Sequence, residues 1–482
     1  MSLEHLGQDE WVAQHEQRRR QQNPAIARVI EGWQSLPRYG QIALLAAVPV
    51  LLPIFVHNDY ILRVVGLVWL YAVLALGLNV VVGLTGLLDL GYVAFFGVGG
   101  YAYAMLSSAQ FNIHLPTWGS LPVATLLAVG LGFLLGLPSL RLQGDYLAIV
   151  TLGFGQIFVQ LMTAMNRVNV PWSSTPVNVT GGPNGIVRLD PVHLLGFQAN
   201  TVTAYYYLML LMLALVLVGI LSLNRSRIGR AWRAVREDSL AAEAMGIPVN
   251  RMRLLAFAVG AGIAGLAGCL FSAWQGSVFP ANFDVPLLIT LYAMVVLGGV
   301  GSLWGMVAGA FVITIVPELL RPGTQIYGIE LQQIVFYGGI LALLAIVLRP
   351  RRRFVLVLGS VFVGGLIIHL VASALIPSQI ATDSQNLIQR WLVIPADSST
   401  ATNLGNFSFF IVTGLFVLLT QIPKRYRDPV LIVALYLLAF VWETRLSQEP
   451  STTVLLLTGA ALIMLMNYRP QGLLGQRRVE IA

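Results

Sequence analysis

Residues Tyr205–Leu223 read YYYLMLLMLALVLVGILSL, a stretch of 19 residues without a charge. An α-helix of about 20 apolar residues is long enough to cross the hydrocarbon core of a bilayer. A second stretch of this kind, Arg253–Trp274, carries its only charge at its first position. These two stretches predict helices that span a membrane.

The composition extends this prediction to the whole chain. Its 482 residues are 57% hydrophobic and only 10% charged, whereas a soluble domain carries about a quarter charged residues. We therefore expect an all-α fold, a polytopic membrane helix bundle with about 14 candidate transmembrane helices, about 10 in a first domain and about 4 later. The expected spans are Ile42–His57, Tyr60–Val82, Leu87–Ala109, Trp118–Leu140, Asp145–Asn166, Thr203–Leu223, Arg253–Trp274, Pro286–Val300, Leu303–Leu320, Ile329–Leu348, Phe354–Leu375, Asn406–Gln421, Pro429–Trp442 and Thr452–Met466.

Basic residues are distributed unevenly between the connecting segments. With the N-terminus inside, the inner segments hold 23 of the 29 Lys and Arg residues and the outer segments hold the remaining 6. Such a bias orients a membrane protein with its basic loops in the cytoplasm. We expect a multi-pass protein of a prokaryotic cytoplasmic (inner) membrane with both termini in the cytoplasm. This explains the net charge of +8 better than nucleic-acid binding does.

Several kinds of chemistry have no basis in the sequence. The chain has a single cysteine, Cys269, and no Gly-x-x-x-x-Gly-Lys-Ser/Thr phosphate loop. The stretch Gly260–Gly265 fits Gly-x-Gly-x-x-Gly, but it lies within an apolar span and lacks the strand that a nucleotide-binding turn needs. Small residues that let membrane helices approach closely explain it better. We expect no catalytic residue, no metal and no cofactor.

One long inner segment, Ser226–Ile247, predicts two short helices. Asp238 is suited to cap the start of the second helix, Gly246 suits a left-handed C-terminal cap, and Pro248 prevents the helix from continuing. A short amphipathic helix outside the membrane is an element that the groove of a partner can bind. The alternative is a solvated basic loop that obeys the positive-inside rule.

Two glycine-rich breaks interrupt the apolar pattern, at Gly83–Gly86 and at Gly298–Gly301. Broken helices expose backbone groups that bind polar solutes in transporters, although two tight cytoplasmic turns would give the same pattern. Asp145, Asp284, Glu318 and His369 lie near or within spans, but Asp89 is the ionisable residue nearest to a break. The candidate substrate path comprises Asn79, Thr85, Gly86, Asp89, Tyr92, Thr151, Gly298 and Gly299.

An outer segment contains the turn Thr180-Gly181-Gly182-Pro183-Asn184-Gly185. Glycine and proline fix tight turns, so the segment is either part of a docking surface or an ordinary surface turn. The candidate docking residues are Thr180, Gly181, Gly182, Asn184 and Gly185.

The segment Ser226–Ile247 resembles the coupling loop of ABC importer permeases, which docks on the ATPase. The stretches Leu76–Phe96, Gly144–Gly155 and Thr180–Gly185 narrow the resemblance to branched-chain amino acid permeases of the LivM kind, over about Leu74–Leu348. The resemblance implies a sister permease subunit, two cytoplasmic ATP-binding subunits that use the ATP, a periplasmic or lipid-anchored substrate-binding protein, membrane lipid, and no nucleic acid. The residues that it assigns to the ATPase-coupling loop are Arg230, Arg233, Asp238, Ala242, Glu243, Ala244 and Gly246.

The chain departs from this family after Pro350. The family closes with Arg-Pro followed by Gly-Leu-Leu-Gly, but here Arg349-Pro350 leads into further apolar spans, and Arg469-Pro470-Gln471-Gly472-Leu473-Leu474-Gly475 comes near the end. We expect a cytoplasmic N-terminal segment (1–40), a permease transmembrane domain (41–350), an inserted transmembrane segment (351–468) and a cytoplasmic tail (469–482).

Two other functions stay open at this point. Related permeases carry urea or short amides, and pocket shape decides between such substrates. An ion-coupled secondary transporter is the second alternative, although such coupling commonly needs centrally placed ionisable groups, and this chain has few.

Overall fold

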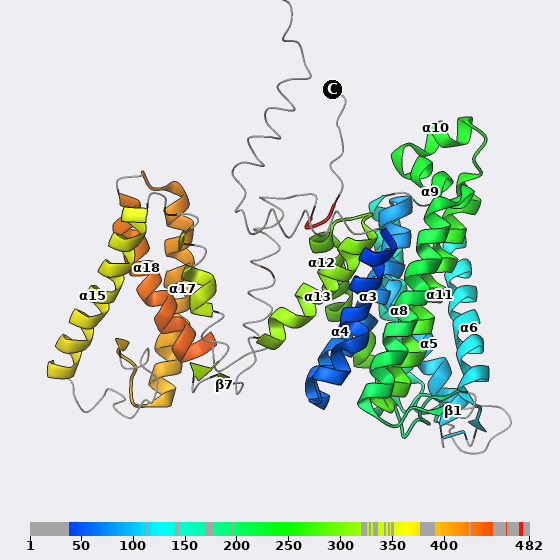
Figure 1. Cartoon of the computed structure of the whole chain (residues 1–482), viewed down its shortest axis with the longest axis horizontal. Coiled ribbons are helices and arrows are strands. Elements are labelled where there is room, and N and C mark those ends of the chain that lie inside the picture. The colour runs from blue at the N-terminus through cyan, green and yellow to red at the C-terminus, as the bar shows by residue number, and fades with distance from the viewer. Residues whose placement is uncertain are drawn as a thin grey trace, which may run out of the picture.

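The computed structural model describes residues 38–319 except 109, 112, 140–141, 143, 169–177 and 195–196. Beyond residue 319 it describes 325–326, 329–330, 336–341, 344–345, 348, 351–375, 391–423, 426–446, 459 and 472–475. This part of the chain is all-α apart from four sheets, each of two short strands. Figure 1 shows the two groups of helices, which we describe separately.

The first group contains the long helices of the expected permease domain. Its helices are α3 (Arg38–Phe55), α4 (Asp59–Asn79), α5 (Tyr92–Leu106), α6 (Thr117–Ser139), α7 (Asp145–Ala164), α8 (Val202–Arg225), α9 (Arg227–Glu237), α10 (Ser239–Ala244), α11 (Val249–Gln275), α12 (Val285–Gly298) and α13 (Leu303–Leu319). Three shorter turns join them, the π-helix η1 (Val80–Leu84) and the 3-10 helices η2 (Gly182–Asn184) and η3 (Pro280–Phe283). The strands are β1 (Ser107–Ser108), β2 (Ile113–His114), β3 (Ile186–Val187), β4 (His193–Leu194), β5 (Phe197–Gln198) and β6 (Ser277–Val278).

Helices α4 and α11 form the centre of this group. Helix α11 packs between α5 and α6, and α4 packs against α8 and α13. Close approach depends on glycine: a side chain at Gly99 would meet the backbone of Gly265, and one at Gly268 would meet the Phe96 carbonyl. These contacts support helix packing as the role of the glycine pattern in α11.

Nine of the described helices are long and apolar enough to span a membrane, so the expected count of fourteen is not reached in the described residues. Helices α5 and α13 are apolar but shorter, and α3 is a further helix over the first expected span. The expected span Thr452–Met466 and part of Ile329–Leu348 lie outside the described residues.

The start of α5 lies five residues after its expected boundary. We expected this span to begin at Leu87, but the helix begins at Tyr92. Gly86 has a φ of +74°, and the Asp89 carboxylate accepts a hydrogen bond from the Gly91 backbone at 2.9 Å. A turn closed by an aspartate in this way competes with helix formation, so the connection runs five residues further.

The second group consists of α15 (Arg351–Leu375), α17 (Ser398–Gln421), α18 (Arg427–Val441) and the π-helix η6 (Trp442–Leu446), with strands β7 (Gln325–Ile326) and β8 (Ile329–Glu330) nearby in sequence. Phe336 stacks on Trp442 with their ring centroids 3.6 Å apart. Arg353 forms an ion pair with Asp428, which joins α15 to α18. Two clusters of buried apolar residues lie among these helices, and Val316 of α13 packs against one of them.

Candidate functional site

The segment between α8 and α11 forms the two expected helices. The Ser226 hydroxyl accepts hydrogen bonds from the backbone of Ile228 and Gly229 at the start of α9. The Asp238 carboxylate accepts from Leu240 at 2.8 Å and from Ala241 at 3.1 Å at the start of α10. Gly246 has a φ of +82°, the left-handed conformation that was expected of it.

Helix α9 is fixed to the membrane helices by one of its faces. Gly229, Trp232 and Val235 are its buried residues, and they recur every three residues, so they lie on one side of the helix. The Trp232 indole donates a hydrogen bond to the Met252 carbonyl in α11 at 2.8 Å. A movement of α9 therefore has to displace the start of α11 or break this contact.

Two exposed arginines of α9 donate hydrogen bonds to backbone carbonyls at the end of α8. Arg230 donates to the Arg225 carbonyl at 3.1 Å, and Arg233 donates to the Asn224 carbonyl at 3.3 Å. Since a cation is favoured near the C-terminal carbonyls of a helix, both predicted coupling residues stabilise the junction of α8 and α9.

Helix α10 and the residue that caps its C-terminus, Met245, expose two large apolar side chains that sequence reasoning missed. Leu240 is 77% exposed and Met245 is 83% exposed, whereas Ala242 packs into a small cluster with Val235 and Val249. Glu243 and Ala244 are exposed as well. Sequence reasoning could have found these residues, because they are large apolar residues on a short helix that lies outside the apolar spans.

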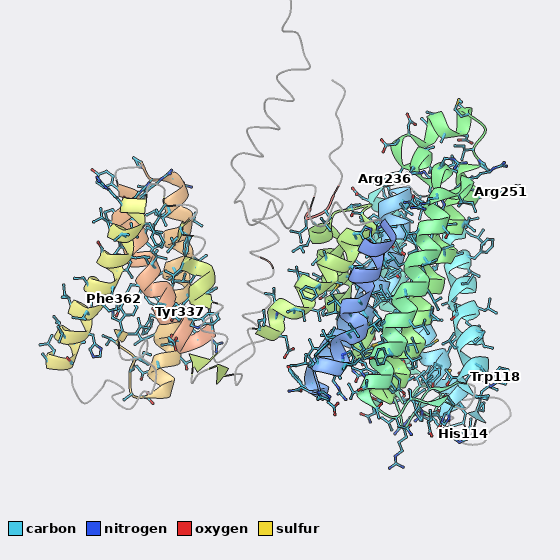
Figure 2. The ribbon with its side chains drawn as sticks, viewed as in Figure 1. His114, Trp118, Arg236, Arg251, Tyr337 and Phe362 are labelled. Carbon is cyan, nitrogen blue, oxygen red and sulfur yellow. The ribbon has the colours of Figure 1, made fainter. Side chains whose placement is uncertain are left out.

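Glu243 has no ion-pair partner within the described part of the chain. Arg236 and Arg251 are basic residues within eight positions of Glu243 in the sequence. Arg236 instead donates to the Gly83 carbonyl in η1. Figure 2 shows Arg236 and Arg251 at the α9 end of the bundle, opposite His114 and Trp118.

The two glycine breaks lie side by side at this same end of the bundle. Helix α4 passes into η1, and the Asn79 side-chain carbonyl accepts a hydrogen bond from the Gly301 backbone at 2.8 Å. Gly299 has a φ of +103° and Gly301 a φ of +91°, values that favour glycine strongly. A hydrogen bond therefore joins the first break to the second, across more than 200 positions of sequence.

The remaining candidate path residues gather beside the first break. Thr151 in α7 accepts a hydrogen bond from the Leu90 backbone at 2.9 Å, and Tyr292 in α12 donates to the Asp89 carbonyl at 2.6 Å. Asn79, Thr85, Asp89, Tyr92 and Thr151 are all buried. The connection before α5 is thus bonded to both α7 and α12.

Three polar atoms of this cluster are buried without a hydrogen-bond partner among the described residues: Asn79 Nδ2, Asp89 Oδ2 and the Tyr92 hydroxyl. An unpaired polar group is costly in an apolar interior. A conformational change that gave these atoms hydrogen-bond partners would therefore lower their free energy. The prediction that these residues line a substrate path stays a prediction.

Asp284 and Asp145 lie at the starts of helices. Asp284 caps α12 by accepting from the Val285 backbone at 2.7 Å and also accepts from Gln156 at 3.1 Å. Asp145 is the first residue of α7, and the capping position is Gly144.

The turn Thr180–Gly185 lies at the end of the bundle opposite α10 (Figure 1), and Leu189, a few residues after the turn, bridges to Ser108 in β1. The Thr180 hydroxyl donates to the Met162 carbonyl at 2.6 Å, and Gly181, Gly182 and Gly185 all have positive φ. Strand β3 follows directly and pairs with β6, which precedes η3. Pro183 and Asn184 are exposed at the tip. The turn is therefore held rigidly and offers a small exposed surface.

Comparisons with known proteins agree on one family. The model of the family described as branched-chain amino acid transport system / permease component matches residues 60–348. The chain is 38% identical over 303 residues to the high-affinity branched-chain amino acid transport system permease protein LivM of Escherichia coli, covering 58% of this chain and 67% of that protein.

Two more distant relatives have the same kind of name. A probable branched-chain amino acid transport permease protein LivM of Methanocaldococcus jannaschii is 29% identical over 260 residues, covering 50% of this chain and 71% of the relative. The permease protein LivH of Escherichia coli is 25% identical over 258 residues, covering 52% and 81%. No solved structure matches the chain significantly.

Proposed function

Because this chain belongs to the family of the permease component of branched-chain amino acid transport systems, we propose that it conducts leucine, isoleucine or valine through a prokaryotic cytoplasmic membrane. It is a multi-pass permease subunit and not a catalytic one. In the proposed complex it pairs with a sister permease, and two ATP-binding subunits on the cytoplasmic side supply the energy. A substrate-binding protein delivers the amino acid on the opposite side.

One observation supports the docking of an ATP-binding subunit more than any other: α10 projects from the bundle with its large apolar side chains exposed. Burial of a leucine or methionine side chain stabilises an interface by about 1.5–3 kcal/mol. Leu240 and Met245 are 77% and 83% exposed, so most of this stabilisation is available to a partner. The caps at Asp238 and Gly246 fix the helix before the partner arrives.

The orientation follows from the proposed docking. If α10 faces the ATP-binding subunits, the turn Thr180–Gly185 is periplasmic and the binding protein approaches it. The exposed tip at Pro183 and Asn184, joined through β3 to β6, gives the binding protein a rigid surface next to the connection between α11 and α12.

The coupling role is tested by two substitutions at the end of α10. A valine at Gly246 has open space around it, since no atom lies within 4 Å of the added Cβ, but the φ of +82° disfavours a β-branched residue by about 1–2 kcal/mol. Glu243→Lys reverses an exposed charge. We expect both variants to insert in the membrane normally and to lose substrate-stimulated ATP hydrolysis and uptake.

The measurement is the ATPase rate of the reconstituted complex in proteoliposomes, with and without liganded binding protein. The affinity of the binding protein for its amino acid serves as the control, because neither residue belongs to that protein. Stimulation equal to the wild type in both variants would show that Ser226–Ile247 is only a solvated basic connection.

A further inference from the structure

Arg236 lies in the last turn of α9 and joins this helix to both glycine breaks. Its guanidinium donates a hydrogen bond to the Gly83 carbonyl in η1. A Cβ at Gly301 would lie 2.9 Å from Arg236 Nη1, and a Cβ at Gly86 would lie 3.2 Å from Arg236 Cγ. The side chain therefore fills the space between the breaks, and glycine at both breaks keeps this space open.

The electrostatics of the end of α4 favour a cation at this place. A helix C-terminus carries a partial negative charge on carbonyls that lack partners within the helix. η1 ends at Leu84, and Gly83 is the residue before it. A π-helical turn within an α-helix is also frequent at functional sites.

The second break is bound on another side by the end of the chain. Leu473 donates to the Leu297 carbonyl at 2.8 Å, and Leu474 donates to the Gly298 carbonyl at 3.1 Å. Asn79 holds Gly301 from the side of α4. Asn79 and the segment 472–474 thus hydrogen-bond the second break, and Arg236 lies beside it at Gly301. Of these, only Arg236 belongs to the helices that project toward the proposed ATPase.

We propose that Arg236 is the positioning residue that transmits movement of α9 and α10 to the two glycine breaks. Trp232 fixes the middle of α9 to α11, so a partner that pulls on α10 rotates α9 about this point and shifts Arg236. The two breaks then move apart or move toward each other. This movement exposes or hides the buried polar cluster around Asn79. The inference rests on the proposed docking of ATP-binding subunits on α10.

The test compares Arg236→Gln and Arg236→Lys with the control Arg227→Gln. Arg227 is exposed at the start of the same helix and lies outside the residues assigned to coupling. Each variant is purified with its sister permease, ATP-binding subunits and binding protein. We measure ATP hydrolysis with and without liganded binding protein, and leucine uptake in the same proteoliposomes.

We expect Arg236→Gln to keep the complex intact and its basal ATP hydrolysis within about twofold, while stimulation and uptake fall at least about tenfold. Arg236→Lys keeps one donor for the Gly83 carbonyl but loses the planar fork, so it should recover part of the uptake. Arg227→Gln should match the wild type.

A thiol reporter separates transmission from simple loss of stability. Val300 is 38% exposed within the second break, whereas the native Cys269 is buried. In a Val300→Cys background, a water-soluble maleimide should label at rates that differ between the resting and the ATP-trapped complex, and Arg236→Gln should remove most of this difference.

Three outcomes overturn this inference: wild-type stimulation and uptake in Arg236→Gln, loss of the ATP-binding subunits from that variant, or a labelling difference that persists without the arginine. A wild-type complex that shows no ATP-driven uptake at all would instead refute the proposed function. The two failures are therefore distinguishable.

Discussion

The double variant Leu240→Asp, Met245→Asp is expected to lose its ATP-binding subunits. Both side chains are exposed in the isolated chain, so the substitutions leave its own core unchanged. In the proposed complex they put two carboxylates into an apolar contact. The loss of two buried side chains at about 1.5–3 kcal/mol each, together with the cost of burying charge, corresponds to at least a hundredfold weaker association.

The measurement is co-purification of the ATP-binding subunits with the tagged permease, followed by titration of the dissociation constant. Asn250→Asp is the matched control, because it adds a carboxylate at an exposed position of the next helix. We expect Asn250→Asp to keep the wild-type affinity. If the double variant binds as tightly as this control, the exposed residues of α10 do not form the docking surface.

The second large effect is expected from Gly472→Val. Gly472 has a φ of +79°, and a Cβ there would lie 2.5 Å from Gly299 Cα. Valine would therefore displace the hydrogen bonds from Leu473 and Leu474, at about 1 kcal/mol each, in addition to about 1–2 kcal/mol of backbone strain. We expect the tail to leave the end of α12 and uptake to fall by more than about tenfold.

Two variants control for this effect. Gly475→Ala alters a nearby glycine that does not have positive φ and should keep uptake. A deletion that joins Pro350 to Gln471 removes the inserted segment but retains Gly472–Leu474, and it should also keep uptake, because the family match ends at residue 348. Normal uptake by Gly472→Val would show that the tail contact is dispensable. Assembly without transport in the deletion would assign the insert an essential role.

Local features of this chain were predictable from the sequence because neighbouring residues determine them. The caps at Asp238 and Gly246 and the tight turn at Thr180–Gly185 depend on a few adjacent residues. The apolar spans were also predictable from the sequence, but their ends and the number of full-length spans were not. The start of α5 illustrates the reason. The turn at Asp89 and Gly91 competes with the helix, and a hydropathy pattern does not detect such a turn.

The contacts that assemble the candidate site were beyond the reach of sequence reasoning. Arg236 and Gly83 are separated by 153 positions, and Asn79 and Gly301 by 222. The return of Gly472–Leu474 to α12, after the inserted segment, likewise depends on the three-dimensional fold and not on local pattern.

The central claim is most directly tested by uptake of labelled leucine into proteoliposomes that contain this permease, its sister permease and the two ATP-binding subunits, with the binding protein outside. The account predicts uptake that requires internal ATP and the binding protein, persists without an ion gradient, and is competed by isoleucine and valine but not by urea. Uptake driven by a proton or sodium gradient in the absence of ATP would contradict it.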